Sequence, residues 1–165
     1  MATVKFFGAP TQTVGELPKA GNKAPGFVLT AQDLSDFNLE SLKGKRVVLN
    51  IFPSLDTDVC AASVRRFNSD ASKLPNTVVV CVSADLPFAA KRFCVANGIE
   101  NVCTGSTFRS DFGKKYGVEF SEGMFKGLMA RSVVVIDTDG TVLGSQFVEE
   151  QSHEPDYAFV EGLLK

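Results

Sequence analysis

The side chains best suited to covalent chemistry in this sequence are its four cysteines, Cys60, Cys81, Cys94 and Cys103. No two of them form a Cys-x-x-Cys pair, and the only histidine, His153, lies near the far end of the chain. This spacing argues against a zinc site and against a dithiol oxidoreductase motif. The remaining uses are a nucleophilic thiol, a transient disulfide and inert packing in the core.

Cys60 stands where a buried strand gives way to a helix. Residues 47–52 form an almost continuous apolar run, which predicts a strand buried on both faces, and Pro53 ends it. A helix is predicted over residues 57–73, with Cys60 in its first turn. Unpaired backbone N–H groups and the helix dipole favour a thiolate there. Thr57 lies one turn earlier, so its hydroxyl can reach the sulfur or an oxygen atom bound beside it.

An apolar stripe along this helix directs the Cys60 side chain toward the protein interior. Its members recur at spacings of four and three residues: Cys60, Val64, Phe67, Ala71 and Leu74. A cysteine on such a stripe can also be a packed core residue. The helix position alone therefore supports a functional thiol and an inert one about equally.

The remaining pattern predicts an α/β fold, because strand-like and helical stretches alternate before a closing hairpin. We expect a thioredoxin-like fold with a mixed central sheet flanked by helices, in a single domain over residues 1–165. An N-terminal β-hairpin is expected at about residues 3–15. The other predicted elements are strands at 27–30, 77–82, 101–103, 132–136 and 141–148, a turn and short helix over 34–43, and helices over 86–97, 108–116 and 155–164.

Composition narrows the classes of function. The chain has 165 residues, of which 44% are hydrophobic and 22% charged, as in a globular protein with one core. A net charge of -2 without clustered basic residues argues against a nucleic-acid partner. No apolar stretch is long enough to span a membrane and no signal peptide is visible, so we expect a cytoplasmic protein. A static disulfide framework is not expected in that reducing compartment.

Several separated motifs resemble those of one protein family. The Pro-x-x-x-Thr-x-x-Cys spacing of Pro53, Thr57 and Cys60 is similar to the active-site signature of peroxiredoxins. Four further segments resemble the bacterial thiol peroxidases, which are atypical two-cysteine peroxiredoxins: residues 83–89, 92–94, 126–128 and 130–137. The resemblance covers essentially the whole chain.

The resemblance implies a role for each site residue. Cys60 would be the peroxidatic cysteine that attacks a hydroperoxide and becomes a sulfenic acid, with the peroxide held by Thr57 and nearby backbone amides. Arg131 would lie beside the thiolate, and Pro53 would shield the sulfur. Cys94 would resolve the sulfenic acid by forming an intrachain disulfide, which thioredoxin then reduces. The family also implies a homodimer and requires no cofactor.

The other cysteines receive different expectations. Cys94 lies late in the helix over 86–97, which Asp85 is expected to cap and Gly98 to end. The predicted inward face of this helix consists of Leu86, Ala89, Ala90 and Phe93, so Cys94 lies at the edge of that face, which suits a thiol that must emerge to react. Cys81 lies within a run of valines and is expected to be a buried structural residue. No role can be assigned to Cys103, which we expect to be structural or partly exposed.

Two expectations concern the neighbourhood of Cys60. Asp58 occupies a position that is usually small or uncharged in thiol peroxidases, and we expect it to point to solvent.

A disulfide between Cys60 and Cys94 requires Cα atoms within roughly 7 Å. Because the helices of Cys60 and Cys94 start from different strand ends, we expect both segments to unfold locally before the disulfide forms.

Two alternatives use the same residues without peroxidase turnover. One is a thiol-based peroxide sensor or redox-signalling partner, and the other is a thioredoxin-fold protein that has lost activity and only binds. The intact set of Pro53, Thr57, Cys60, Cys94 and Arg131 favours the enzyme.

Overall fold

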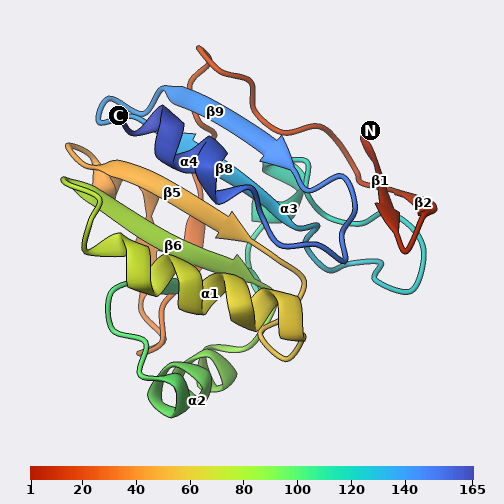
Figure 1. Cartoon of the computed structure of the whole chain (residues 1–165), viewed down its shortest axis with the longest axis horizontal. Helices are drawn as coiled ribbons and strands as arrows, with labels where there is room; N and C mark the ends of the chain where they lie inside the picture. Colours follow the sequence, from red (N-terminus) through yellow and green to blue (C-terminus); the bar gives the residue numbers. More distant parts are fainter.

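The fold is organised around a mixed sheet of seven strands. A computed structural model describes all residues from 1 to 165 (Figure 1). The strands of this sheet are β3 (Val28–Thr30), β4 (Asp36–Asn38), β5 (Arg46–Ile51), β6 (Thr77–Ser83), β7 (Cys103–Ser106), β8 (Ser132–Ile136) and β9 (Val142–Phe147). Their order is β4-β3-β7-β6-β5-β8-β9, with β5, β6 and β7 parallel and the other pairs antiparallel. The expected thioredoxin-like architecture is confirmed.

The centre of the sheet is formed by valine-rich strands that are buried on both faces. The five residues of β8 are all buried, as are the last five of β5. Such strands read as continuous apolar runs because helices or loops cover both of their faces. For this reason the sequence predicted β5, β6 and β8 to within about one residue at each end.

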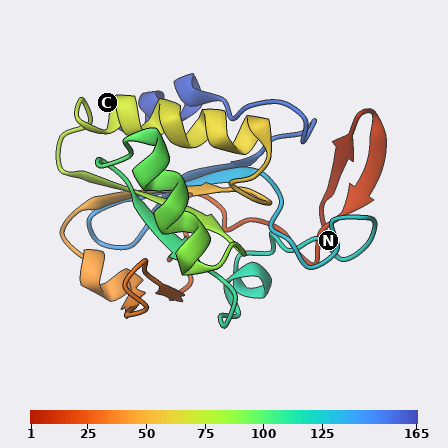
Figure 2. The same ribbon diagram turned by 90° about the horizontal axis from the view of Figure 1, so that it is seen from below.

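Helices and loops cover the two faces of this sheet. Helices α1 (Asp58–Ala71), α2 (Pro87–Asn97) and α4 (Tyr157–Leu163) contribute buried side chains to the core on one face. The short helix α3 (Phe112–Lys115) contributes to the core on the other face, against which the 3-10 helix η1 (Leu39–Leu42) also packs. Figure 2 shows α1 and α4 lying side by side over the sheet. No helix has the length and apolar character needed to cross a membrane.

Strands β1 (Thr3–Phe6) and β2 (Ala9–Gln12) form the expected N-terminal hairpin, which projects from the main body in Figure 2. The hairpin is attached to the segment after β9, where the backbone N–H of Gln151 donates to the carbonyl of Lys5 at 2.7 Å. Val4 also packs with Phe120 and Ala130 in a small separate core. The hairpin therefore shares this small core with Ala130, the residue next to Arg131.

Glu150 fixes the turn of the hairpin. Its carboxylate accepts hydrogen bonds from the backbone N–H groups of Phe7 and Gly8, at 3.0 and 2.7 Å, and from both donors of Ser152. The backbone and hydroxyl of Ser152, followed by Gly8 and Phe7, lower the pKa of Glu150 from 4.5 to about 2.

A pH dependence of stability follows from this shift. Because the folded pKa is depressed, the Glu150 contribution is present above pH 4.5 and is lost as the pH falls toward 2. We expect the Tm difference between wild type and Glu150→Gln to be larger at pH 7 than at pH 3. Thermal unfolding of both proteins at the two pH values measures it, and an equal difference at both would contradict this role.

The structure corrects three local predictions. The segment predicted as a turn and short helix over residues 34–43 contains strand β4 before η1. The helix predicted over 108–116 is reduced to α3, because the preceding residues form turns. Asp85 was predicted to cap the helix over 86–97, but Leu86 is the N-cap residue of α2 and Asp85 binds elsewhere. The predicted stop at Gly98 is correct, with Gly98 at a left-handed φ of 64°.

Candidate active site

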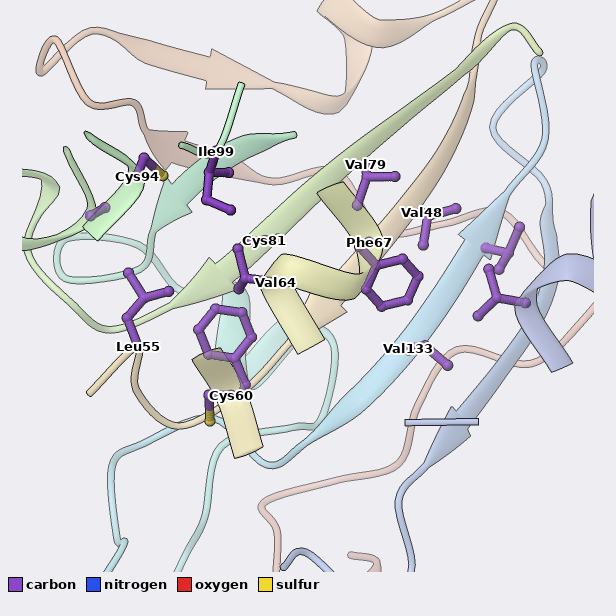
Figure 3. Close-up of a cluster of buried hydrophobic side chains, with 14 of the residues drawn as sticks. Val48, Leu55, Cys60, Val64, Phe67, Val79, Cys81, Cys94, Ile99 and Val133 are labelled. Carbon is purple, nitrogen blue, oxygen red and sulfur yellow. The ribbon is translucent and has the colours of Figure 1, made fainter. Parts of the chain in front are cut away.

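Cys60 is buried at the junction between β5 and α1. It is the third residue of α1, and its residue exposure is 0%. Phe52 and Pro53, which follow β5, are also buried. The predicted inward orientation of Cys60 is therefore correct, and the side chain belongs to the same core cluster as Val64 and Leu55 (Figure 3).

Arg131 lies directly beside the sulfur. Its Nη1 atom donates to Sγ of Cys60 at 3.1 Å, and the residue is only 3% exposed. The register of the sheet explains why Arg131 lies beside Cys60, because Ile51 at the end of β5 pairs with Ser132, the first residue of β8. Arg131 precedes β8 and so lies next to the loop that carries Cys60. A guanidinium in a buried site stays charged and stabilises a neighbouring thiolate.

The other edge of the Arg131 guanidinium is unoccupied by the protein. Nε donates to the carbonyl of Gln151 at 3.0 Å and Nη1 donates to Cys60, whereas Nη2 has no hydrogen-bond partner in the chain. This leaves one charged donor available to an oxygen atom placed next to the sulfur.

Thr57 is the N-cap residue of α1, but its side chain does not cap the helix. Its hydroxyl instead donates to the carbonyl of Ser54 at 3.1 Å. The hydroxyl is therefore tied to the loop between Pro53 and Cys60, where it can also accept a hydrogen bond from a bound molecule.

Asp85 holds this loop from the neighbouring loop, which follows strand β6. Its carboxylate accepts from the hydroxyl of Ser54 and from the backbone N–H of Leu55, both at 2.8 Å, and from the hydroxyl of Ser83 at 2.7 Å. The parallel pairing of β5 and β6 brings both loops to the same edge of the sheet. Sequence reasoning assigned Asp85 to a helix cap and so missed this function.

Cys94 is more deeply placed than the sequence predicted. Its residue exposure is 6%, and the buried positions of α2 are Pro87, Ala90 and Cys94, so it belongs to the inward face and not to its edge. Gln32 donates to its sulfur at 3.4 Å and to Thr104 at 3.0 Å. Burial raises the pKa of the Cys94 thiol, and the hydrogen bond from Gln32 partly offsets this effect.

Cys60 and Cys94 are both free thiols in the same core cluster. Figure 3 shows them on separate elements, with the Leu55 side chain in the region between them. The site thus combines a buried thiol, an adjacent fixed positive charge and a second thiol in the same core.

Comparisons with known proteins agree with this arrangement. The family model described as Redoxin matches residues 19–160. Thiol peroxidases of Corynebacterium glutamicum and Mycobacterium tuberculosis are each 50% identical over 157 residues, which is 95% of this chain and 95% and 94% of theirs. The chain belongs to the thiol peroxidase branch of the peroxiredoxin family.

Solved structures of peroxiredoxins share the fold. The peroxiredoxin-like protein from Aquifex aeolicus is 39% identical, with a TM-score of 0.93 over 99% of this chain and 96% of that one. The thiol peroxidase from Chromobacterium violaceum is 23% identical, with a TM-score of 0.91 over 99% and 96% of the two chains. This peroxiredoxin is an oxidoreductase that carries out thiol-dependent peroxide reduction.

The two remaining cysteines of this peroxiredoxin have no contact with Arg131. Cys81 is 2% exposed in the centre of β6, and burial raises its pKa to about 12, with a small opposing effect from Asn50. Its predicted burial is confirmed, and its thiol is poorly suited to react at neutral pH. Cys103 is exposed at the start of β7, in agreement with the expectation that it is partly exposed.

The sequence also did not predict the structural role of Asn50 and Ser63. Asn50 interrupts the apolar run of β5 and donates to the hydroxyl of Ser63 at 3.2 Å, and Ser63 donates to the carbonyl of Cys60 at 2.8 Å. This buried chain of hydrogen bonds connects the strand to the first turn of α1.

Asp58 is exposed, as expected, and makes no ion pair or side-chain hydrogen bond. Solvent and salt screen an exposed carboxylate. We therefore expect Asp58→Gly to move the pH midpoint of Cys60 alkylation only slightly. Alkylation rates followed on the Cys60 peptide by mass spectrometry measure this midpoint, and a large fall in it would place the carboxylate close to the sulfur.

Proposed function

We propose that Cys60 is the peroxidatic nucleophile of this enzyme and that Arg131, Thr57 and Pro53 complete its site. The observation that carries the proposal is the 3.1 Å contact between Nη1 of Arg131 and the buried Sγ of Cys60. A thiolate is the reactive form of cysteine, and this charge favours the thiolate within a core that would otherwise disfavour it. Pro53 is buried beside the loop and helps to exclude water from the sulfur.

The first step breaks the O–O bond of the hydroperoxide. The Cys60 thiolate attacks the terminal oxygen, an S–O bond forms, and the electron pair of the O–O bond leaves on the alkoxide or hydroxide. That anion takes up a proton to give an alcohol or water. Nη2 of Arg131 is the donor placed to stabilise the charge that develops on the peroxide oxygens. The proton of the Thr57 hydroxyl is bound to the carbonyl of Ser54, so this hydroxyl can hold the hydroperoxide by accepting from its O–H group.

The second step is resolution by Cys94. The Cys94 thiol gives up its proton and the resulting thiolate attacks the sulfenic sulfur of Cys60. An S–S bond forms, the S–O bond breaks, and the departing hydroxide takes up a proton to leave as water. The two cysteines are 34 positions apart in the sequence. Chain-entropy models assign about 4 kcal/mol to such a crosslink, and strain in the rearranged site reduces this value.

Resolution requires that both cysteines leave their present packing. Cys60 and Cys94 are held by separate hydrogen bonds, from Arg131 and Gln32, and are buried by different helices. We propose that the first turn of α1 after Thr57 and the last turns of α2 before Gly98 unfold locally in this step.

Hydrogen exchange on the reduced and peroxide-oxidised proteins measures this opening. We expect the amides of both segments to exchange faster in the oxidised form, while those of β5 and β8 keep their protection. If both segments retain equal protection after oxidation, disulfide formation does not involve local unfolding.

We further propose that thioredoxin reduces the disulfide, in a reducing cytoplasm, and that the whole chain acts as one domain within a homodimer. Three apolar side chains are exposed on α2 or directly before it: Leu86 at 49%, Phe88 at 66% and Val95 at 76%. Exposed apolar side chains on one element are a feature of partner-binding surfaces. They support contact with a protein reductant at the helix that carries Cys94.

A coupled assay tests the complete cycle. Purified protein is mixed with hydrogen peroxide or an alkyl hydroperoxide, thioredoxin, thioredoxin reductase and NADPH, and NADPH oxidation is followed. We expect many turnovers per protein. A single oxidation followed by slow turnover would indicate a peroxide sensor, and an absence of peroxide consumption would indicate an inactive binding protein.

A further inference from the structure

Gln151 is a fully buried polar residue that the proposed reaction does not use. It lies four positions after the end of β9, and its exposure is 0%. Burial of an amide side chain is costly unless its donors and acceptor are all paired. The partners of Gln151 therefore indicate why this position is polar.

The side chain of Gln151 is bound to the backbone of Arg131. Its Oε1 atom accepts from the N–H of Arg131 at 2.5 Å, and its Nε2 atom donates to the carbonyl of Arg131 at 3.0 Å. Nε2 also donates to the carbonyl of Val148 at 2.6 Å. The glutamine thus pairs with both backbone groups of one residue, as a neighbouring strand would do.

The backbone of Gln151 is bound to the side chain of the same arginine. Its carbonyl accepts from Nε of Arg131 at 3.0 Å. With Nε fixed on one side and the backbone fixed on the other, the guanidinium has little freedom to turn. Its Nη1 atom is thereby aimed at Sγ of Cys60, and Nη2 is left unpaired beside it.

Gln151 is itself held from the N-terminal hairpin. Its N–H donates to the carbonyl of Lys5 at 2.7 Å, and the N–H of Lys5 donates to the carbonyl of Glu149 at 2.8 Å. The turn of the hairpin donates hydrogen bonds to the carboxylate of Glu150, the residue before Gln151. The segment carrying Gln151 is therefore fixed between the hairpin and Arg131.

We propose that Gln151 is a positioning residue for peroxide reduction, acting by holding Arg131 in the orientation that donates to Cys60. This inference rests on the proposed roles of Cys60 and Arg131. Gln151 does not touch the sulfur, so its effect passes through the arginine. Preorganised donors are effective because they need not reorient as charge develops.

The test compares Gln151→Leu with wild type. Leucine has a similar volume but cannot bind the Arg131 backbone. We expect the second-order rate of Cys60 oxidation by hydrogen peroxide to fall roughly tenfold, as loss of a well-paired buried hydrogen bond predicts. We also expect the pH midpoint of Cys60 alkylation to rise.

Gln146→Leu is the control, because this half-buried glutamine on β9 makes no side-chain hydrogen bond. The oxidation rate and the alkylation midpoint of this variant should stay at their wild-type values.

A double-variant measurement separates positioning from general destabilisation. In an Arg131→Met background, Gln151→Leu should lower Tm but leave the alkylation midpoint unchanged, because the charge that it positions is gone. If Gln151→Leu does not fold, Gln151→Asn, which keeps both polar groups on a shorter side chain, should show the same shifts to a smaller extent.

Two results would overturn the inference. One is that the folded Gln151 variant loses Tm but keeps the wild-type oxidation rate and pH midpoint. The other is that it shifts the midpoint equally with Arg131 present and absent. A failure of the proposed function gives a different result from a failure of this inference. If Arg131 has no part in the site, the single variant Arg131→Met will leave the pH profile of Cys60 alkylation unchanged.

Discussion

Cys60→Ser is expected to abolish peroxide consumption. The serine hydroxyl is not ionised at neutral pH, even beside Arg131, so the site loses its nucleophile while keeping its shape. The loss should reach the background of the assay, measured as NADPH oxidation in the thioredoxin-coupled system. None of the other three cysteines contacts Arg131, so none can replace it.

A matched control uses the exposed cysteine. Cys103→Ser removes a thiol outside the proposed site and should keep wild-type turnover. Retained turnover in Cys60→Ser, or loss of turnover in Cys103→Ser, would assign the nucleophile to a different cysteine.

Arg131→Met is expected to have the second largest effect. Methionine retains an unbranched apolar side chain in this buried position but supplies neither charge nor donors. We expect the rate of Cys60 oxidation to fall by about 10²- to 10³-fold, the usual cost of removing a preorganised donor to a developing anion. The pH at which Cys60 becomes reactive should also rise, since the thiolate loses its neighbouring positive charge.

Rapid-mixing oxidation rates and the alkylation pH profile measure these two effects. Arg46→Met provides a comparison, because Arg46 is also partly buried and binds the carbonyls of Leu164 and Pro75, far from the sulfur in the sheet. It should reduce Tm without changing the pH profile. Identical profiles for wild type and Arg131→Met would remove Arg131 from the site.

The sequence predicted the elements around Cys60 well because their signals are local. Valine runs identify strands buried on both faces, and the spacing of Cys60, Val64 and Phe67 identifies the inward face of α1. All three of these residues are buried. By contrast, the position of Arg131 depends on the antiparallel pairing of β5 with β8, which no local pattern specifies. Only the family resemblance placed Arg131 at the site.

Three of the residues that sequence reasoning missed act through contacts between distant segments. Asp85 binds a loop 30 positions earlier, Gln151 binds Arg131 20 positions earlier, and Gln32 reaches Cys94 62 positions later. The wrong position predicted for Cys94 has a related cause. Leu86 was counted on the inward face of the helix, whereas it precedes α2 and is exposed, so the buried face is rotated toward Cys94.

Peptide mapping of the peroxide-treated protein, without reductant, tests the central claim most directly. The reduced protein is treated with one equivalent of hydrogen peroxide, free thiols are blocked, and the digest is analysed by mass spectrometry. We expect a single crosslink joining the Cys60 and Cys94 peptides, with Cys81 and Cys103 recovered as blocked thiols. A crosslink that includes Cys81 or Cys103, or recovery of Cys60 as an unoxidised thiol, would contradict the assignment of Cys60 as nucleophile and Cys94 as its resolving partner.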